Sequence, residues 1–226
     1  MKAALLDELQ SARRDNIPVA VVTRIENGNQ FLVYSDACSV ADLTPAVLAE
    51  AREILRAARS AMINEGRLFV RSYVPAYRLF IIGAVHIAQA LSTLALECGY
   101  EVCIIDPRRA FATRERFHNV ELCDQWPDEA MAQLVPDAQT AVVTLAHDPK
   151  IDDPALIAAL NSDAFYIGAL GSRRTHAKRV ERLTELGLGD KLQRINAPVG
   201  LNLGGRSHAE IAVAILAQLI QARYSS

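Results

Sequence analysis

The sequence lacks several features that would assign a class of protein at once. In 226 residues, no apolar run approaches the roughly 20 residues that a membrane-spanning helix needs. The net charge of -2 gives no general attraction for nucleic acid or anionic lipid, so we expect neither as a partner. The amino terminus, "MKAALLDELQSARRDN", carries acidic residues early and has no signal-peptide cleavage pattern. We therefore expect a cytoplasmic protein.

Metal and redox chemistry also lack their usual patterns. The four cysteines (Cys38, Cys98, Cys103 and Cys123) are far apart, and no two form a Cys-x-x-Cys pair. No grouping of His, Cys and Asp has a convincing metal-ligand spacing, so we expect no metal site. Cys98 and Cys103 flank a glycine turn in apolar surroundings, and we interpret them as buried free thiols.

The pattern of the chain changes near residue 75. Before it, "AALLDELQSARR" and "TPAVLAEAREILRAARSAM" have helical periodicity, and "PVAVVTRI", "QFLVYS" and "RLFVRSYV" read as strands. From Arg78 onward, apolar strands alternate with helical segments, which predicts a mostly parallel sheet with helices on both faces. We therefore expect an α/β protein with a small α+β domain at 1–75 and a main domain at 76–226.

A partial dinucleotide-binding fingerprint opens the main domain. In "RLFIIGAVHIAQAL", Gly83 permits a sharp turn and Ala88 permits close packing of helix on strand. Val85 stands where the second glycine would let a pyrophosphate approach, which argues against NAD(P) in its standard pose. Asp106 ends the next strand about 20 residues on, where a ribose-binding acid belongs. His86 follows the turn as a pocket candidate.

Other predicted strand ends carry polar groups toward the same edge of the sheet. "GALGSRR" precedes a helix, and its Gly171, Ser172, Arg173 and Arg174 suit an anion at a helix start. His147 and Asp148 end another strand, and either they face a ligand or Asp148 bonds local backbone ahead of Pro149. The arginine-rich loop after Asp106, which includes Arg108, is either solvated or a lid over an anion. Ser207 and Glu210 fit a capping box.

These segments together resemble the XdhC/CoxI family of accessory proteins for molybdenum hydroxylases. The resemblance covers about residues 75 to 223 and rests on five ordered motifs, "GAVHIAQAL", "IIDPR", "HDPKIDDPAL", "YIGALGSRRTHAKR" and "PVGLNLGG…EIAVAILAQ". Two departures are Val85, where the family has glycine, and the absence of a Gly-Ser-x-Pro-Arg loop in the first 75 residues.

The resemblance implies a Rossmann-like main domain and a chaperone rather than an enzyme. The cargo would be molybdenum cofactor, a molybdopterin, delivered to the apoenzyme of a xanthine dehydrogenase-type hydroxylase. A cofactor sulfurase, a second XdhC/CoxI-type chain or a homodimer are further partners that it leaves open. Motif positions place the cofactor site at Gly83, His86, Asp106, Arg108, His147, Asp148, Gly171, Ser172, Arg173 and Arg174, with no catalytic residue. An NAD(P)-dependent oxidoreductase and a ligand-free regulatory subunit remain as alternatives.

Overall fold

The protein folds as two compact units, Met1–Pro75 and Ala76–Ser226. The computed structural model describes residues 2–39 and 43–225. Each unit has its own sheet and its own buried apolar clusters. No helix within the described residues is both long and apolar enough to cross a membrane.

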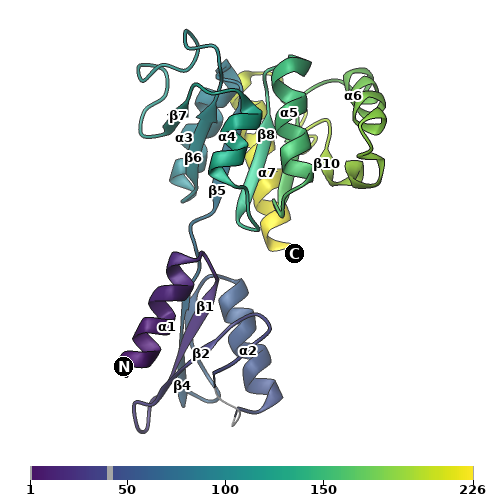
Figure 1. Ribbon diagram of the computed structural model, residues 1–226. Coiled ribbons are helices and arrows are strands. Elements are labelled where there is room, and N and C mark those ends of the chain that lie inside the picture. The colour runs from purple at the N-terminus through teal and green to yellow at the C-terminus, as the bar shows by residue number, and fades with distance from the viewer. Residues whose placement is uncertain (1, 40–42, 226) are drawn as a thin grey trace. The chain divides into compact units, whose positions relative to one another are not determined.

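The first unit is an antiparallel sheet with one helix on each face. Its strands lie in the order β2-β1-β4-β3. In chain order the elements are α1 (Ala3–Arg14), β1 (Val19–Arg24), β2 (Gln30–Val33), α2 (Pro45–Arg56), β3 (Ser60–Ile63) and β4 (Leu68–Tyr73). Alternate residues of β1 face opposite ways: Val19 and Val21 pack with α1, and Ala20 and Val22 pack with α2. Figure 1 shows the two helices on opposite sides of these strands.

The sequence places the end of α2 too late. Thr44 caps the helix and Pro45 follows it, as the sequence predicts. The helix ends at Arg56, however, and Ala58 then takes a left-handed conformation with φ 50°. The periodicity assigns residues up to Met62 to the helix, but Ser60–Ile63 instead pairs antiparallel with β4. Pairing along the sheet outweighs the local preference of the alanine-rich segment for helix.

The second unit is a doubly wound parallel sheet. Its six strands lie in the order β10-β9-β8-β5-β6-β7, and every pairing is parallel. The strands are β5 (Arg78–Ile82), β6 (Glu101–Ile105), β7 (Glu121–Cys123), β8 (Thr140–Thr144), β9 (Tyr166–Ala169) and β10 (Ile195–Asn196). The helices are α3 (His86–Glu97), α4 (Pro127–Leu134), α5 (Pro149–Leu160), α6 (Arg173–Glu185), the 3-10 helix η1 (Gly189–Arg194) and α7 (His208–Tyr224). The predicted mostly parallel sheet is confirmed.

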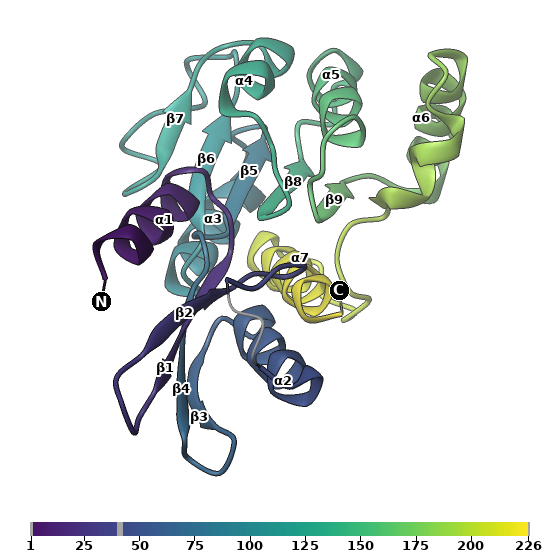
Figure 2. The same ribbon diagram turned by 60° about the horizontal axis from the view of Figure 1, so that its bottom comes forward.

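Both faces of this sheet are covered, as the sequence predicts. Leu79 and Ile81 of β5 face a cluster that includes α3 and α7, while Phe80 and Ile82 face a cluster with α4, α5 and α6. Figure 2 shows α4, α5 and α6 on one side of the strands and α3 and α7 on the other. This burial on both faces explains why β5 reads as a continuous apolar run rather than an alternating one.

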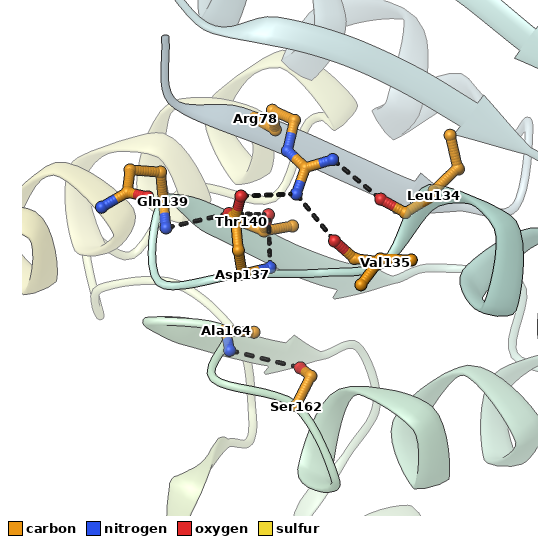
Figure 3. A network of polar contacts seen from close by, with 8 residues as sticks. All are labelled: Arg78, Leu134, Val135, Asp137, Gln139, Thr140, Ser162 and Ala164. Atoms are coloured by element: carbon orange, nitrogen blue, oxygen red, sulfur yellow. Dashed lines mark hydrogen bonds and ion pairs between the residues drawn. The ribbon is translucent and has the colours of Figure 1, made fainter. Parts of the chain in front are cut away.

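A polar network secures the amino-terminal edge of the same sheet (Figure 3). The Arg78 guanidinium donates to the carbonyl oxygens of Leu134 and Val135, at 2.8 Å each, and pairs with Asp137 at 2.9 Å. The other Asp137 oxygen accepts from the Thr140 hydroxyl at 2.7 Å. These contacts tie the first residues of β5 and β8 to the end of α4, so this edge is occupied by the chain's own polar groups.

Two local predictions need correction. In the sequence, Asp153-Pro154 has the pattern of a helix cap and first position, which predicts a helix start there. The helix α5 begins at Pro149 instead, and Asp148 caps it by accepting from the Lys150 N–H at 3.0 Å. Pro154 therefore lies inside the helix. Cys98 is exposed rather than buried because it caps the carboxyl end of α3, whereas Cys103 is buried in β6, where burial raises its pKa to about 12.

Candidate functional site

The carboxyl ends of the parallel strands meet at one edge of the second unit. The sheet order places β8 on one side of β5 and β6 on the other. From β5 the chain adds β6 and β7 toward one end of the sheet, and it then adds β8, β9 and β10 toward the other end, so the order of strands reverses between β5 and β8. In open parallel sheets, ligands bind outside the carboxyl ends of the strands near such a reversal. The loops after β5, β6, β8 and β9 therefore form the candidate site, which lies at the edge opposite the Arg78 network.

Asp106, at the end of β6, is the most completely bonded group at this edge. Its carboxylate is fully buried and accepts from the Ala84 N–H at 2.8 Å and the Arg108 N–H at 3.0 Å. Arg108 also donates to it twice through its side chain, at 2.8 and 2.9 Å. Burial favours a higher pKa, but these hydrogen bonds outweigh it and hold the pKa of Asp106 below its ordinary value. The carboxylate positions the β5 and β6 loops, and its place in a ligand site stays a prediction.

The glycine turn after β5 packs against the β8 loop. Gly83 has φ 102°, and a Cβ atom there would lie 2.8 Å from the backbone nitrogen of Ala146. Glycine is therefore required by packing between two strand-end loops, before any ligand is considered. Val85 has an ordinary φ of -88° as the residue before α3, and its side chain packs against the cluster beneath α3 and α7. The turn accepts valine without backbone strain.

The β8 loop is held in turn by a buried acid from α5. Asp152 is 2% exposed and accepts from the Ala146 N–H at 3.2 Å. Burial raises its pKa to about 6, against the opposing effects of this hydrogen bond and of the nearby Arg179. His147, between these residues in space, has a left-handed backbone with φ 60° and an exposed side chain. The loop therefore turns the His147 side chain outward, while the hydrogen bond to Asp152 holds the loop backbone at Ala146.

Arg179, from α6, is a buried cation with unused donors. Its side chain is 3% exposed, and its Nη2 donates to the carbonyl oxygen of Leu170 at 3.0 Å, just past the end of β9. Nε and Nη1 are buried and find no acceptor among the residues that the structure describes. Burial lowers the pKa of Arg179 despite the attraction of Asp152 and Asp153. A buried guanidinium with two idle nitrogens is costly to the fold.

These groups surround a cavity of about 230 Å³ between the amino-terminal part of α5 and one side of α6. The cavity is lined by His147, Pro149, Asp152, Asp153, Arg174, Thr175, Lys178, Arg179 and Arg182. Arg182 is held at its margin by a two-point pair with Asp153, at 2.6 and 3.0 Å. Ser172 begins α6 beside the cavity, where its hydroxyl accepts from the Thr175 N–H at 3.1 Å.

The structure divides the predicted site residues into three groups. His147 and Arg174 line the cavity, and Asp148, Gly171 and Ser172 lie at the caps of the two helices that border it, whereas Arg173 is exposed outside its lining. Gly83 lies in the adjoining turn after β5, which packs on the β8 loop, and Asp106 and Arg108 follow β6, where Asp106 accepts from the Ala84 N–H of that turn. His86, the first residue of α3, does not line the cavity, and its ring is stacked on that of His208 of α7 at 5.2 Å between ring centres. These positions bring most of the predicted residues to one edge.

Sequence reasoning missed the buried charges at the cavity, Asp152 and Arg179, and also the exposed Lys178 and the half-buried Arg182 that line it. A signal for Arg179 was present, since it precedes the buried Leu183 by four residues and therefore shares its inward face of α6. A charged residue on the apolar stripe of a helix indicates a buried charge. No cluster of three potential metal-binding His, Cys, Asp or Glu side chains occurs in the described parts of the chain.

Comparison with known proteins assigns this edge and its sheet to a family. The model of the XdhC Rossmann domain matches residues 79–219, which include every strand of the second sheet from β5 to β10 apart from Arg78. The chain belongs to the XdhC family. The match confirms the resemblance drawn from the motifs, and it confirms the Rossmann-like fold.

Two curated relatives match this XdhC chain over about the same length. The molybdenum cofactor insertion chaperone PaoD of Escherichia coli K12 is 35% identical over 156 residues, which are 69% of this chain and 43% of PaoD. A probable xanthine dehydrogenase subunit of Bacillus subtilis 168 is 29% identical over 157 residues, 69% of this chain and 46% of that protein. The chain thus spans less than half the length of either relative.

A solved structure resembles the XdhC chain over 97% of its residues. It is described as a xanthine dehydrogenase from Bacillus halodurans, and it superposes with a TM-score of 0.71 at 21% identity, with 64% of that chain covered. At this identity the likeness bears on the fold alone.

Proposed function

We propose that this XdhC chain binds molybdenum cofactor and assists its insertion into a xanthine dehydrogenase-type molybdenum hydroxylase. The observation that carries the proposal is the 35% identity to PaoD, an insertion chaperone for that cofactor, across 156 residues of the chain. On this proposal the protein holds and releases its cargo unchanged, and none of its residues acts as a catalyst.

The chemistry of the edge suits such a cargo. Molybdopterin carries a phosphate group, a pterin ring with donors and acceptors, and an anionic dithiolene that holds the metal. Cationic side chains at the cavity, together with the start of α6, offer charge and N–H donors to anionic groups. His147 and the Asp148 loop offer polar contacts beside them. The idle nitrogens of Arg179 supply donors that no described residue uses.

A nicotinamide-dependent oxidoreductase is not favoured. In the usual dinucleotide fold, an acid after the second strand binds the ribose hydroxyls. Asp106 occupies that place here, but each of its oxygens already accepts two hydrogen bonds from Ala84 and Arg108. Val85, in place of the second glycine, removes the close approach that a pyrophosphate needs.

We extend the proposal to partners. The receiving protein is the apoenzyme of a molybdenum hydroxylase. A cofactor sulfurase or a second XdhC/CoxI-type chain would take part in the transfer before the apoenzyme or together with it. A second copy of this chain is a further partner to test by its mass in solution. The relatives are more than twice as long as their matched segments.

The proposal is tested by retention and transfer of the cofactor. The purified chain is mixed with molybdenum cofactor, passed through a desalting column and then added to an apo-hydroxylase whose activity reports insertion. We expect retention with affinity near micromolar, on the order of -8 kcal/mol, and faster activation than with free cofactor. A parallel column with NADH serves as the competing ligand. Retention of NADH without retention of the pterin would overturn the proposal.

A further inference from the structure

We propose that the cavity around Arg179 is an oxyanion subsite that takes a phosphate monoester. This deepens the proposed function, on which its biological ligand rests, because the phosphate of molybdopterin is the group of that chemistry in the cargo. The two nitrogens of Arg179 that find no acceptor in the described chain, Nε and Nη1, are the observation that points to a ligand.

The position of Arg179 leaves charged donors for an anion. Its Nη2 donates to the Leu170 carbonyl oxygen, while Nε and Nη1 keep N–H groups without acceptors among the described residues. These two nitrogens point to different edges of the guanidinium, and each can give an oxyanion a charge-assisted hydrogen bond, which is stronger than a bond between neutral groups. Asp152 does not serve as this partner, because its hydrogen bonding is directed to the backbone of the β8 loop at Ala146.

The charges around the cavity leave a positive surplus. Four cationic side chains line it, Arg174, Lys178, Arg179 and Arg182, against the carboxylates of Asp152 and Asp153. Arg182 and Asp153 neutralise one another through their two-point pair. The three remaining cations face the single carboxylate of Asp152, so a dianion would balance the site.

Size selects a small group rather than a whole cofactor. Pockets for drug-sized ligands occupy roughly 300–1,000 Å³, whereas this cavity has about 230 Å³. The Thr175 side chain lies at the first turn of α6, where unpaired N–H groups also favour an anion. The phosphate would enter the cavity while the remainder of a larger ligand stays along the strand ends.

The first experiment titrates inorganic phosphate into the full chain and follows heat or ³¹P line width. Three variants separate the contributions: Arg179→Met removes the buried cation at similar volume, Arg174→Gln removes a cation of the rim, and Lys191→Gln removes the same charge from η1 outside the cavity. We expect saturable binding by the unsubstituted chain, at least tenfold weaker binding by Arg179→Met, several-fold weaker binding by Arg174→Gln and no change for Lys191→Gln.

Folding is checked separately, because Arg179→Met also loses the bond to Leu170. The urea transition of each variant is measured, and Arg174, which is exposed, provides a test that does not disturb the core. Equal phosphate affinity in folded Arg179→Met and the unsubstituted chain would overturn the inference. So would the absence of saturable binding at up to about 10 mM phosphate, or an equal loss of affinity in Lys191→Gln, which would indicate nonspecific attraction.

The second experiment distinguishes the subsite from the proposed function. Retention of molybdenum cofactor is compared between the unsubstituted chain and Arg179→Met, with and without added phosphate. We expect tenfold weaker retention by the variant and competition by phosphate in the unsubstituted chain. If both proteins retain the cofactor equally, the subsite assignment falls while the chaperone function stands. If neither retains it but phosphate binding depends on Arg179, the chaperone function falls while the oxyanion site stands.

Discussion

The substitution Asp106→Asn tests whether a buried carboxylate holds the strand-end loops together. The carboxylate accepts four hydrogen bonds, two on each oxygen, from Ala84 and Arg108. Asparagine keeps one oxygen and turns an amide toward the donors that met the other. Two charge-assisted hydrogen bonds are then lost, at about 1.5–3 kcal/mol each, although the part-exposed Arg108 side chain lets water replace part of that. We expect a loss of about 3 kcal/mol in the free energy of unfolding.

The assay is urea unfolding followed by far-UV circular dichroism and by the fluorescence of Trp126. This is the chain's single tryptophan, and it lies in the second unit, so its signal reports on the unit that contains Asp106. The matched control is Asp124→Asn, which removes a carboxylate from an exposed pair with Arg109, where both side chains are at least half exposed. Surface pairs of this kind contribute at most about 1 kcal/mol.

The dependence on pH provides a second measure for the same residue. A carboxyl group whose pKa is lowered on folding stabilises the protein above its unfolded pKa, and that contribution is lost as the pH falls through the folded pKa. The difference between Asp106→Asn and the unsubstituted chain should therefore be full at pH 7 and shrink below about pH 4. Equal losses in Asp106→Asn and Asp124→Asn at pH 7 would refute the structural role assigned to Asp106.

Three further substitutions test neighbouring contacts by the same unfolding assay. Asp152→Asn should have a free energy of unfolding up to about 3 kcal/mol higher than that of the unsubstituted chain above pH 7. Burial raises the pKa of Asp152 to about 6, so the unsubstituted chain loses stability as the pH rises through that value. A difference in stability between the two proteins that does not close near pH 4 would contradict this. Gly83→Ala should lower the free energy of unfolding by at least about 1 kcal/mol more than Gly99→Ala, since both glycines have positive φ but only Gly83 faces the Ala146 backbone. Equal losses would exclude a steric overlap between a Cβ at position 83 and Ala146. Arg78→Met should lower the free energy of unfolding by about 2 kcal/mol by leaving two carbonyl oxygens without a donor, whereas Arg67→Met, at an exposed position, should change it by almost nothing. Similar losses in both variants would refute the stabilising role of the Arg78 network.

The sheet of the second unit could be predicted from the sequence because its signals are local. Apolar runs such as β5, broken by glycine turns and helical segments, specify parallel strands buried on both faces. The Ser207–Glu210 capping box also follows from spacing alone, and the structure confirms it. The β3 strand could not be predicted in this way, because Ser60–Ile63 becomes a strand only by pairing with β4.

The candidate site was predictable in location but not in detail. Strand ends identify the edge, and Ser172, Asp148 and His147 lie there. The sequence does not reveal which polar groups are already hydrogen-bonded to other residues of the protein, since that depends on contacts between separate loops. The carboxylate of Asp106 is fully hydrogen-bonded by Ala84 and Arg108, whereas Arg179 keeps two nitrogens without acceptors among the described residues while Asp152 bonds the β8 loop.

These contacts form a continuous run along the edge of the sheet. Asp106 of β6 fixes the turn after β5, Gly83 of that turn packs on the β8 loop, and Asp152 fixes that loop from α5. Arg179 then joins α6 to the end of β9. Each loop is positioned by a neighbour that is itself buried, so the edge is preorganised before a ligand arrives. Arg179 is the member of this run with nitrogens left over among the described residues, and its neighbours hold its guanidinium in place at the wall of the cavity, which lowers the cost of ordering it around an anion.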